Sequence, residues 1–152
     1  MTVTLRHGPE DDVQLAKAME SSWRARRGVA AAIGVVGGLD LWATSWPPAP
    51  ERGPPYFWLV GEDGPVGFAR LSRGPGDTFT ARPVFLRPEA RGRGLGEALY
   101  RFLIDGGVAM RPDTEQSAHA QRLWEKLTAA YGAEDDGDGP VARAPAAAPR
   151  GP

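Results

Sequence analysis

The residues best suited to chemistry form a short run of glycines and arginines, Arg91-Gly92-Arg93-Gly94-Leu95-Gly96. Because glycine has no Cβ, the backbone of this run can turn tightly and present its N–H groups to an anion. Apolar residues at helical spacing begin at Leu95, and the N-terminus of a helix adds unpaired N–H groups and the positive end of its dipole. Arg82 and Arg87 lie shortly before the run and add positive charge. The run is therefore predicted to bind a phosphate group.

Two other phosphate-binding motifs fit the run poorly. It lacks the Gly-Lys-Ser/Thr sequence of a P-loop, which excludes that class of nucleotide site. A dinucleotide-binding fingerprint starting at Gly92 needs Gly or Ala where Glu97 stands, although Asp113 lies near the place of the expected acidic residue. A plainer interpretation stays open, in which the glycines form a tight connection and the arginines a solvated face.

The run must be positioned by a sheet that precedes it. Alternating apolar residues predict a short strand at 3–5, and the aromatic and β-branched segments 56–60, 66–71 and 78–86 predict an antiparallel meander. Pro83 lies inside the last of these strands and cannot donate a ladder hydrogen bond, so it marks an edge or a bulge.

Helices are predicted on both sides of this sheet region in the sequence. Apolar residues spaced by three and four predict helices at 11–23, from Leu95 to the Gly106-Gly107 pair, and at 115–131, with a short strand at 108–110. The apolar, Gly-rich segment 28–46 is expected to form a second short helix.

These elements predict an α/β (α+β) fold, with a mixed, mostly antiparallel central sheet flanked by helices. Residues 1–133 are expected to form one domain. Residues 134–152 contain almost no large apolar side chain and are expected to be a disordered tail.

The composition limits the remaining functions. The 152 residues include no cysteine and only two histidines, His7 and His119, which excludes a disulfide framework and a cysteine nucleophile; we expect no metal site. With 18 Lys and Arg against 19 Asp and Glu, we expect neither nucleic acid nor a membrane as partner. The N-terminus shows no signal-peptide pattern and no apolar stretch is long enough to cross a bilayer, so we expect a cytoplasmic protein.

The segment from Val84 to Leu99 resembles the acyl-CoA-binding signature of the GNAT acetyltransferase superfamily. The signature is Arg or Gln, two residues, Gly, one residue, then Gly or Ala, and Arg91, Gly94 and Gly96 match it. The resemblance implies that the strand backbone pairs with the pantetheine arm of CoA and that the loop amides hold its pyrophosphate. The residues implied for CoA binding are Val84, Phe85, Leu86, Arg91, Gly92, Arg93, Gly94, Leu95, Gly96 and Glu97.

The late helix is also similar to the family. Ser117 stands where the family often has an Asn that contacts CoA, and a hydroxyl can partly replace that amide. Trp124 stands where a Tyr commonly protonates the leaving thiolate, and an indole N–H has no useful acidity. We therefore interpret Trp124 as a core aromatic residue.

The remaining catalytic groups have weak candidates. His119 is a candidate base and Tyr131 a candidate acid, although surface exposure and core packing are their commoner roles. A bulge at Pro83 would free strand N–H groups to stabilise an oxyanion. Tyr100 lies off the apolar stripe and is expected at the surface. The acceptor site, by resemblance, has four aromatic candidates that could equally be core residues: Trp42, Trp46, Phe57 and Trp58.

The resemblance implies an acyltransferase that moves an acetyl group from its cosubstrate acetyl-CoA to an amine. One alternative is a GNAT-like module that binds acyl-CoA or a protein partner without catalysis, and another is a nucleotide-binding regulatory module. The family usually adds two C-terminal strands, for which this sequence offers only 141–143. The sheet is then expected to end early or to be completed by a partner chain, as in a homodimer.

Overall fold

The computed structural model describes residues 3–4, 9–132, 134–135 and 137–144. Its helices are α1 (Pro9–Arg26), α2 (Leu95–Asp105) and α3 (Ala118–Tyr131). Its strands are β1 (Val3–Thr4), β2 (Ala31–Val36), β3 (Leu39–Ala43), β4 (Tyr56–Gly61), β5 (Gly64–Arg73), β6 (Phe79–Ala81), β7 (Phe85–Leu86), β8 (Met110–Arg111), β9 (Glu115–Gln116), β10 (Glu134–Asp135) and β11 (Pro140–Val141).

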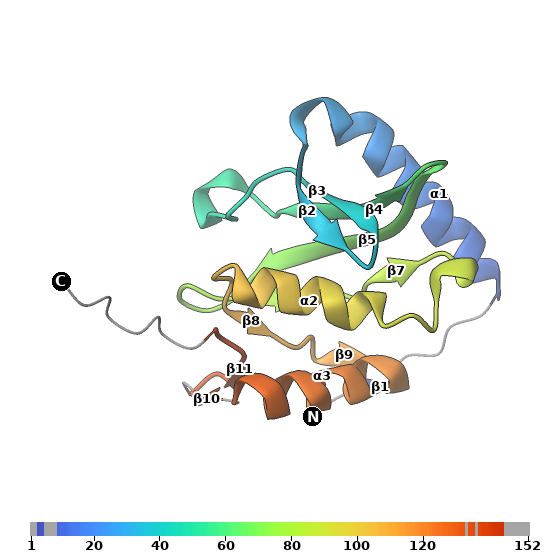
Figure 1. Cartoon of the computed structure of the whole chain (residues 1–152). Helices are drawn as coiled ribbons and strands as arrows, with labels where there is room; N and C mark the ends of the chain where they lie inside the picture. The colour runs from blue at the N-terminus through green and yellow to red at the C-terminus, as the bar shows by residue number, and fades with distance from the viewer. Residues whose placement is uncertain (1–2, 5–8, 133, 136, 145–152) are drawn as a thin grey trace.

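A seven-stranded sheet forms the centre of the fold, with the order β2-β3-β4-β5-β6-β8 and with β7 paired to β5 (Figure 1). Every pair in it is antiparallel except β6 with β8, which is parallel. The predicted fold class, a mixed and mostly antiparallel sheet flanked by helices, is confirmed. The pairs β1–β9 and β10–β11 are separate.

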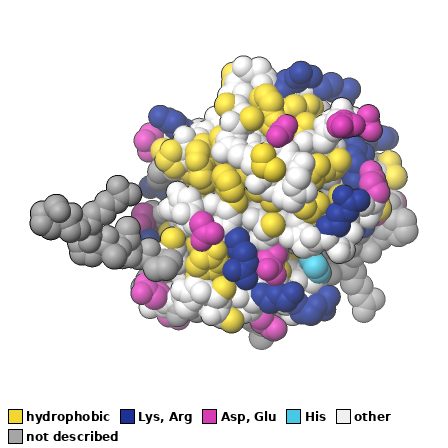
Figure 2. Space-filling view, in the orientation of Figure 1, with side chains coloured by type: hydrophobic (Ala, Val, Ile, Leu, Met, Phe, Trp, Pro, Cys, Tyr) yellow, Lys and Arg dark blue, Asp and Glu magenta, His cyan; other side chains and the backbone are white. Residues whose placement is uncertain are grey.

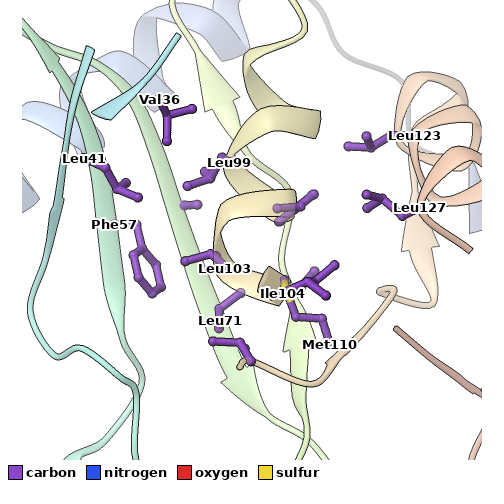
Figure 3. Close-up of a cluster of buried hydrophobic side chains, with 14 of the residues drawn as sticks. Val36, Leu41, Phe57, Leu71, Leu99, Leu103, Ile104, Met110, Leu123 and Leu127 are labelled. Carbon is purple, nitrogen blue, oxygen red and sulfur yellow. The ribbon is translucent and has the colours of Figure 1, made fainter. Parts of the chain in front are cut away.

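The two faces of the sheet are covered by different helices. Successive residues of a strand point to opposite faces, so in β4 Phe57 packs into the cluster formed with α2 and α3, whereas Trp58 packs with Met19 and Trp23 of α1. Figure 3 shows Leu99 and Leu103 of α2 beside the first of these faces. Helix α2 lies between the sheet and α3, so apolar residues cover more of its surface than a single stripe.

This position of α2 corrects one prediction. Tyr100 is buried, with 3% of its surface exposed, and its ring lies 5.6 Å from that of Trp124. The expectation that Tyr100 lies at the surface is wrong, because the side of α2 away from the sheet is covered by α3.

The segment 28–46 also differs from its prediction. It contains no α-helix but the hairpin β2–β3, whose turn is made by Gly37 and Gly38 with φ of +58° and +79°. Two positive φ values are what a two-residue hairpin turn requires, and glycine adopts them without strain. The apolar residues of this segment follow a period of two, since Leu41 and Ala43 point to the α2 face and Trp42 to the α1 face.

The C-terminal segment is more ordered than expected. Val141 and Ala142 are buried, and Ala142 exchanges two backbone hydrogen bonds with Met110, of 2.8 and 3.0 Å. The sequence offers only 141–143 for a C-terminal strand, and the structure has β11 at Pro140–Val141. Residues 134–135 and 137–144 therefore do not fit the disordered tail predicted for 134–152. Residues 145–152 lie outside the described part. The segment covers the edge of β8, which would otherwise be unpaired.

Replacing Val141 by threonine tests this packing. The substitution keeps the volume and β-branching but buries a hydroxyl at a site that is 1% exposed. We expect the free energy of unfolding to fall by about 1–2 kcal/mol in urea denaturation. The same replacement at Val29, which is 76% exposed, should leave it nearly unchanged; equal stability of the two variants would contradict the burial of the segment.

Candidate functional site

The predicted irregularity at Pro83 is a break between two short strands. β5 pairs with β6 through Leu71 to Arg73, and farther back with β7 through Gly67 and Phe68. Residues 82–84 belong to neither strand. Within the described residues, the backbone N–H of Val84 donates to no acceptor. The break therefore presents a free N–H group in the middle of the sheet.

The other edge of this strand opens at the same point. β6 pairs with β8 through Phe79 and Thr80, and among the described residues no strand pairs with the second edge of β7. Strands β6 and β8 thus part immediately before the break. Val84, Phe85 and Leu86, the residues implied for the pantetheine arm, lie along the opening. The carbonyl oxygen of Leu86 accepts a hydrogen bond of 3.1 Å from Arg91 Nε.

The glycine-arginine run forms a tight connection into α2. Gly92 and Gly94 have φ of +78° and +70°, and open space lies where a Cβ of either would point. The first helical bond runs from the N–H of Ala98 to the carbonyl of Gly94, at 3.0 Å. In the described part of the chain, the backbone N–H groups of residues 92–97 donate to no carbonyl. Six free N–H groups at a helix N-terminus form a site for an anion.

The arginines around the run are more neutralised than the sequence suggested. Arg82 pairs with Asp113, Arg87 with Glu20, and Arg91 with Asp12. Figure 2 likewise shows Lys and Arg side chains lying next to Asp and Glu side chains on one face of the molecule. Among the described residues, the exposed side chain of Arg93 has no hydrogen-bond or ion-pair partner. The positive potential at the run therefore comes mainly from the backbone N–H groups and Arg93.

The other residues implied for CoA have mainly structural contacts. Leu95 is buried, and Gly96 lies next to Leu123 of α3. The Glu97 carboxylate pairs with Arg101 at 3.1 Å and with Lys126 at 3.7 Å. The Ser117 hydroxyl caps α3 by accepting from the N–H of Ala120 at 3.1 Å, which leaves its proton available to another acceptor.

Among the described residues, neither weak catalytic candidate makes a hydrogen bond or ion pair with residues 82–84. His119 is exposed in the first turn of α3. Tyr131 contacts Asp105 at 2.8 Å, and burial together with this hydrogen bond raises the pKa of its hydroxyl. Asp105 ends α2, and ten residues of helix place it about 15 Å from the glycine-arginine run. The structure does not bring Tyr131 and the run together.

The aromatic residues considered for the acceptor site and for the acid step belong to the core. Phe57 and Trp58 are completely buried, and Trp42 packs edge-on against Trp23. Trp46 lies against Phe57 and Phe102. Trp124 is 6% exposed, which confirms its interpretation as a core residue.

A polar network that the sequence did not reveal converges on Arg82, the last residue before Pro83. The buried Tyr100 hydroxyl donates to the Arg82 carbonyl at 2.9 Å, and burial raises the pKa of that phenol above its ordinary value. The Arg82 guanidinium donates to Ser72 at 2.8 Å and to Asp113 at 3.1 Å. Asp113 is 8% exposed. The network joins β5, β6, α2 and the residues after β8, and so fixes the geometry of the break.

A pocket of about 550 Å³ opens beside this network. Its walls are the ends of β6 and β8, with Thr80, Arg82, Arg111, Asp113 and Gln116, and the segment 138–140 opposite them. Asp113 lines it, a residue that the sequence singles out only as part of a dinucleotide fingerprint. Its role depends on the register between β6 and β8, which local sequence patterns do not contain.

Two further observations concern partners. None of the described helices is long and apolar enough to cross a membrane. Across the described residues, no three His, Asp or Glu side chains gather as metal ligands.

In a comparison with known proteins, residues 36–129 match one family model, described as the acetyltransferase (GNAT) family. Similar solved structures include the N-acetyl transferase YhhK from E. coli bound to coenzyme A, described as putative in its name, with 13% identity over 66% of this chain and 78% of that one and a TM-score of 0.41. A cAMP-binding acyltransferase from Mycobacterium smegmatis is 13% identical, with a TM-score of 0.49. The match covers 91% of this chain and 55% of the acyltransferase. A histone acetyltransferase HPA2 and related acetyltransferase from Corynebacterium glutamicum has 17% identity over 96% and 82% of the chains, with a TM-score of 0.42. No match was found among curated proteins.

Proposed function

Because the chain belongs to the acetyltransferase (GNAT) family, we propose that it transfers an acetyl group from acetyl-CoA to a primary amine. In this reaction a bond forms between the amine nitrogen and the acetyl carbon, and the bond from that carbon to sulfur breaks. One amine proton is lost, the sulfur leaves as a thiolate and is protonated, and the products are an amide and free CoA.

The observation that carries this proposal is that, within the described part of the chain, the N–H groups of residues 92–97 have no acceptor and follow a strand, β7, with one unpaired edge. N–H groups at a helix N-terminus are suited to a pyrophosphate, and the open edge of β7 is suited to the amides of a pantetheine arm. Residues 91–97 would hold the pyrophosphate, Val84, Phe85 and Leu86 would hold the arm, and Ser117 offers a further hydroxyl.

The break at Pro83 supplies the group that the reaction centre needs most. The carbonyl oxygen of a thioester becomes negative as the amine attacks, and a preorganised N–H donor stabilises it. Val84 has such an N–H without an acceptor in the described part of the chain, and the Tyr100 hydroxyl donates at 2.9 Å to the carbonyl of Arg82, two residues before Val84. Val84 is therefore the proposed oxyanion donor.

The positions of His119 and Tyr131 favour proton transfer through water, or a substrate that binds as a neutral amine. His119 is exposed, and Tyr131 of α3 bonds to Asp105 at the end of α2 that is far from the glycine-arginine run. The buried indole of Trp124 also favours a second candidate function, an acyl-CoA-binding module without catalysis, since it replaces the phenol common at this place in the family. Positioning alone contributes several kcal/mol to such reactions, so turnover does not require a dedicated acid.

Thermal melting with acetyl-CoA tests the donor site. At a concentration one hundred times its Kd, a ligand adds about 2.7 kcal/mol to the stability of the folded state, a shift of several degrees for a domain of this size. We expect this shift with acetyl-CoA and CoA, and none with ATP or NAD. A shift with ATP or NAD alone would support the nucleotide-binding alternative and contradict the proposal.

Release of free thiol then tests turnover. The chain has no cysteine of its own, so a thiol reagent reports only the CoA that is set free. We expect release from acetyl-CoA with at least one member of a broad panel of primary amines, with the acetylated amine identified by mass spectrometry. Binding without release across the panel would favour the non-catalytic module.

A further inference from the structure

We propose that the pocket between the ends of β6 and β8 binds the amine acceptor, and that the carboxylate of Asp113 receives the acceptor's ammonium group. This inference rests on the proposed function, since it takes the strand break as the place of the acyl donor. The ligand class is an aliphatic primary amine that enters the pocket as a cation.

The strand register places Asp113 beside the break. Thr80 and Arg111 are partners in the parallel pair β6–β8. Two residues later in the chain, just beyond each strand, stand Arg82 and Asp113, whose side chains form an ion pair at 3.1 Å. Val84, the proposed oxyanion donor, follows Arg82 by two residues, roughly 7 Å along an extended strand. The carboxylate therefore lies across the opening from the place where the acyl group would react.

The Asp113 carboxylate has acceptor capacity to spare. Its Oδ2 accepts from Arg82, and its Oδ1 accepts from the N–H of Glu115 at 3.2 Å. A carboxylate offers about four acceptor positions, so these two bonds fix its orientation and leave positions for an ammonium. Because Asp113 is 8% exposed, a cation bound there would be partly shielded from water, where an ion pair is stronger.

The cations of the pocket are already engaged with the protein. Arg111 is 5% exposed and donates to Thr78 at 2.9 Å and to the carbonyl of Gly139 at 3.1 Å. Arg82 donates to Ser72 as well as to Asp113. Thr80, Gln116 and the exposed Asp138 add polar groups to the wall. The pocket wall thus holds two arginines bonded to the protein, neutral polar groups and the buried carboxylate of Asp113, which is the group suited to an amine ligand.

A pair of CoA derivatives tests this site without a known acceptor. In one, the CoA sulfur carries a carbonylmethyl group linked to a 3-aminopropyl chain; in the other, the chain ends in methyl instead of ammonium. We expect calorimetry to show the ammonium derivative binding the wild-type chain about tenfold more tightly. Equal affinities on the wild-type chain, a comparison that needs no variant, would overturn the inference.

Two variants assign the preference to Asp113. In Asp113→Asn we expect the two derivatives to bind within about twofold of each other, with CoA affinity unchanged. In the matched control Glu115→Gln, which removes an exposed carboxylate two residues away, the tenfold preference should remain. A preference that survives in folded Asp113→Asn would overturn the assignment. Failure of CoA itself to bind would instead overturn the proposed function and this site with it.

Discussion

Replacing Gly94 by valine is expected to remove almost all of the stabilisation that acetyl-CoA gives to the wild-type chain. Gly94 caps α2 with φ of +70°, and its missing side chain leaves open space beside the free N–H groups of residues 92–97. A β-branched side chain would fill that space and would oppose the positive φ. If the Kd rises a hundredfold, the contribution of the ligand falls from about 2.7 to about 0.4 kcal/mol at the same concentration. Scanning calorimetry with and without acetyl-CoA measures both values.

The control for this variant is Gly76→Val. Gly76 has φ of +63° and also faces open space, but it lies in the turn between β5 and β6. Both variants should lose about 1–2 kcal/mol of stability without ligand, because both force a β-branched residue into the left-handed region. Only Gly94→Val should lose the response to acetyl-CoA. A full response in Gly94→Val would show that the donor does not bind at the glycine-arginine run.

The glycine-arginine run and the strand break were predictable because each depends on residues that are adjacent in the sequence. Three glycines between a strand and a helix predict a tight turn with positive φ values, whatever the rest of the fold is. Pro83 has no backbone N–H, so it cannot donate a ladder hydrogen bond wherever its strand is placed. The hairpin at 31–43 was missed for a local reason as well. Its alternation is short and contains small residues, so the apolar, Gly-rich segment 28–46 predicted a short helix instead.

The charge and proton chemistry of the site depends on contacts that sequence spacing does not contain. Arg91 and Asp12 are 79 residues apart in the chain, and Arg87 and Glu20 are 67 apart. Asp113 reaches Arg82 only because β6 and β8 pair in one register. Tyr100 is buried because its ring packs on Trp124 of α3 and its hydroxyl reaches the Arg82 carbonyl, both distant in the sequence. A basic cluster in sequence therefore became a set of ion pairs that connect α1, the run and the end of β8.

Replacing Tyr100 by phenylalanine is expected to lower kcat about tenfold while leaving the stabilisation by acetyl-CoA unchanged. The variant removes the hydroxyl that donates to the Arg82 carbonyl at 2.9 Å but keeps the ring that packs on Trp124. Arg82 is the first residue of the break, so the orientation of its carbonyl fixes the Arg82–Pro83 peptide plane, and the next peptide plane carries the Val84 N–H. The free energy of unfolding should also fall by about 1–2 kcal/mol, because the hydrogen bond between the Tyr100 hydroxyl and this carbonyl is lost. Initial rates of thiol release with an amine that the wild-type chain acetylates measure kcat and KM separately.

Tyr131→Phe is the matched control, because it also removes one phenol hydroxyl while keeping the ring. That hydroxyl bonds to Asp105 at the far end of α2, so its removal should leave kcat unchanged. If Tyr131→Phe lowers kcat and Tyr100→Phe does not, Tyr131 is the acid and the network around Arg82 is structural only. If Tyr100→Phe instead weakens acetyl-CoA binding and kcat together, the hydroxyl supports the donor site rather than the reacting carbonyl. We expect Tyr100→Phe to lower kcat without weakening acetyl-CoA binding. The reason is that the hydrogen bond from the N–H donor strengthens only as charge develops on the thioester oxygen.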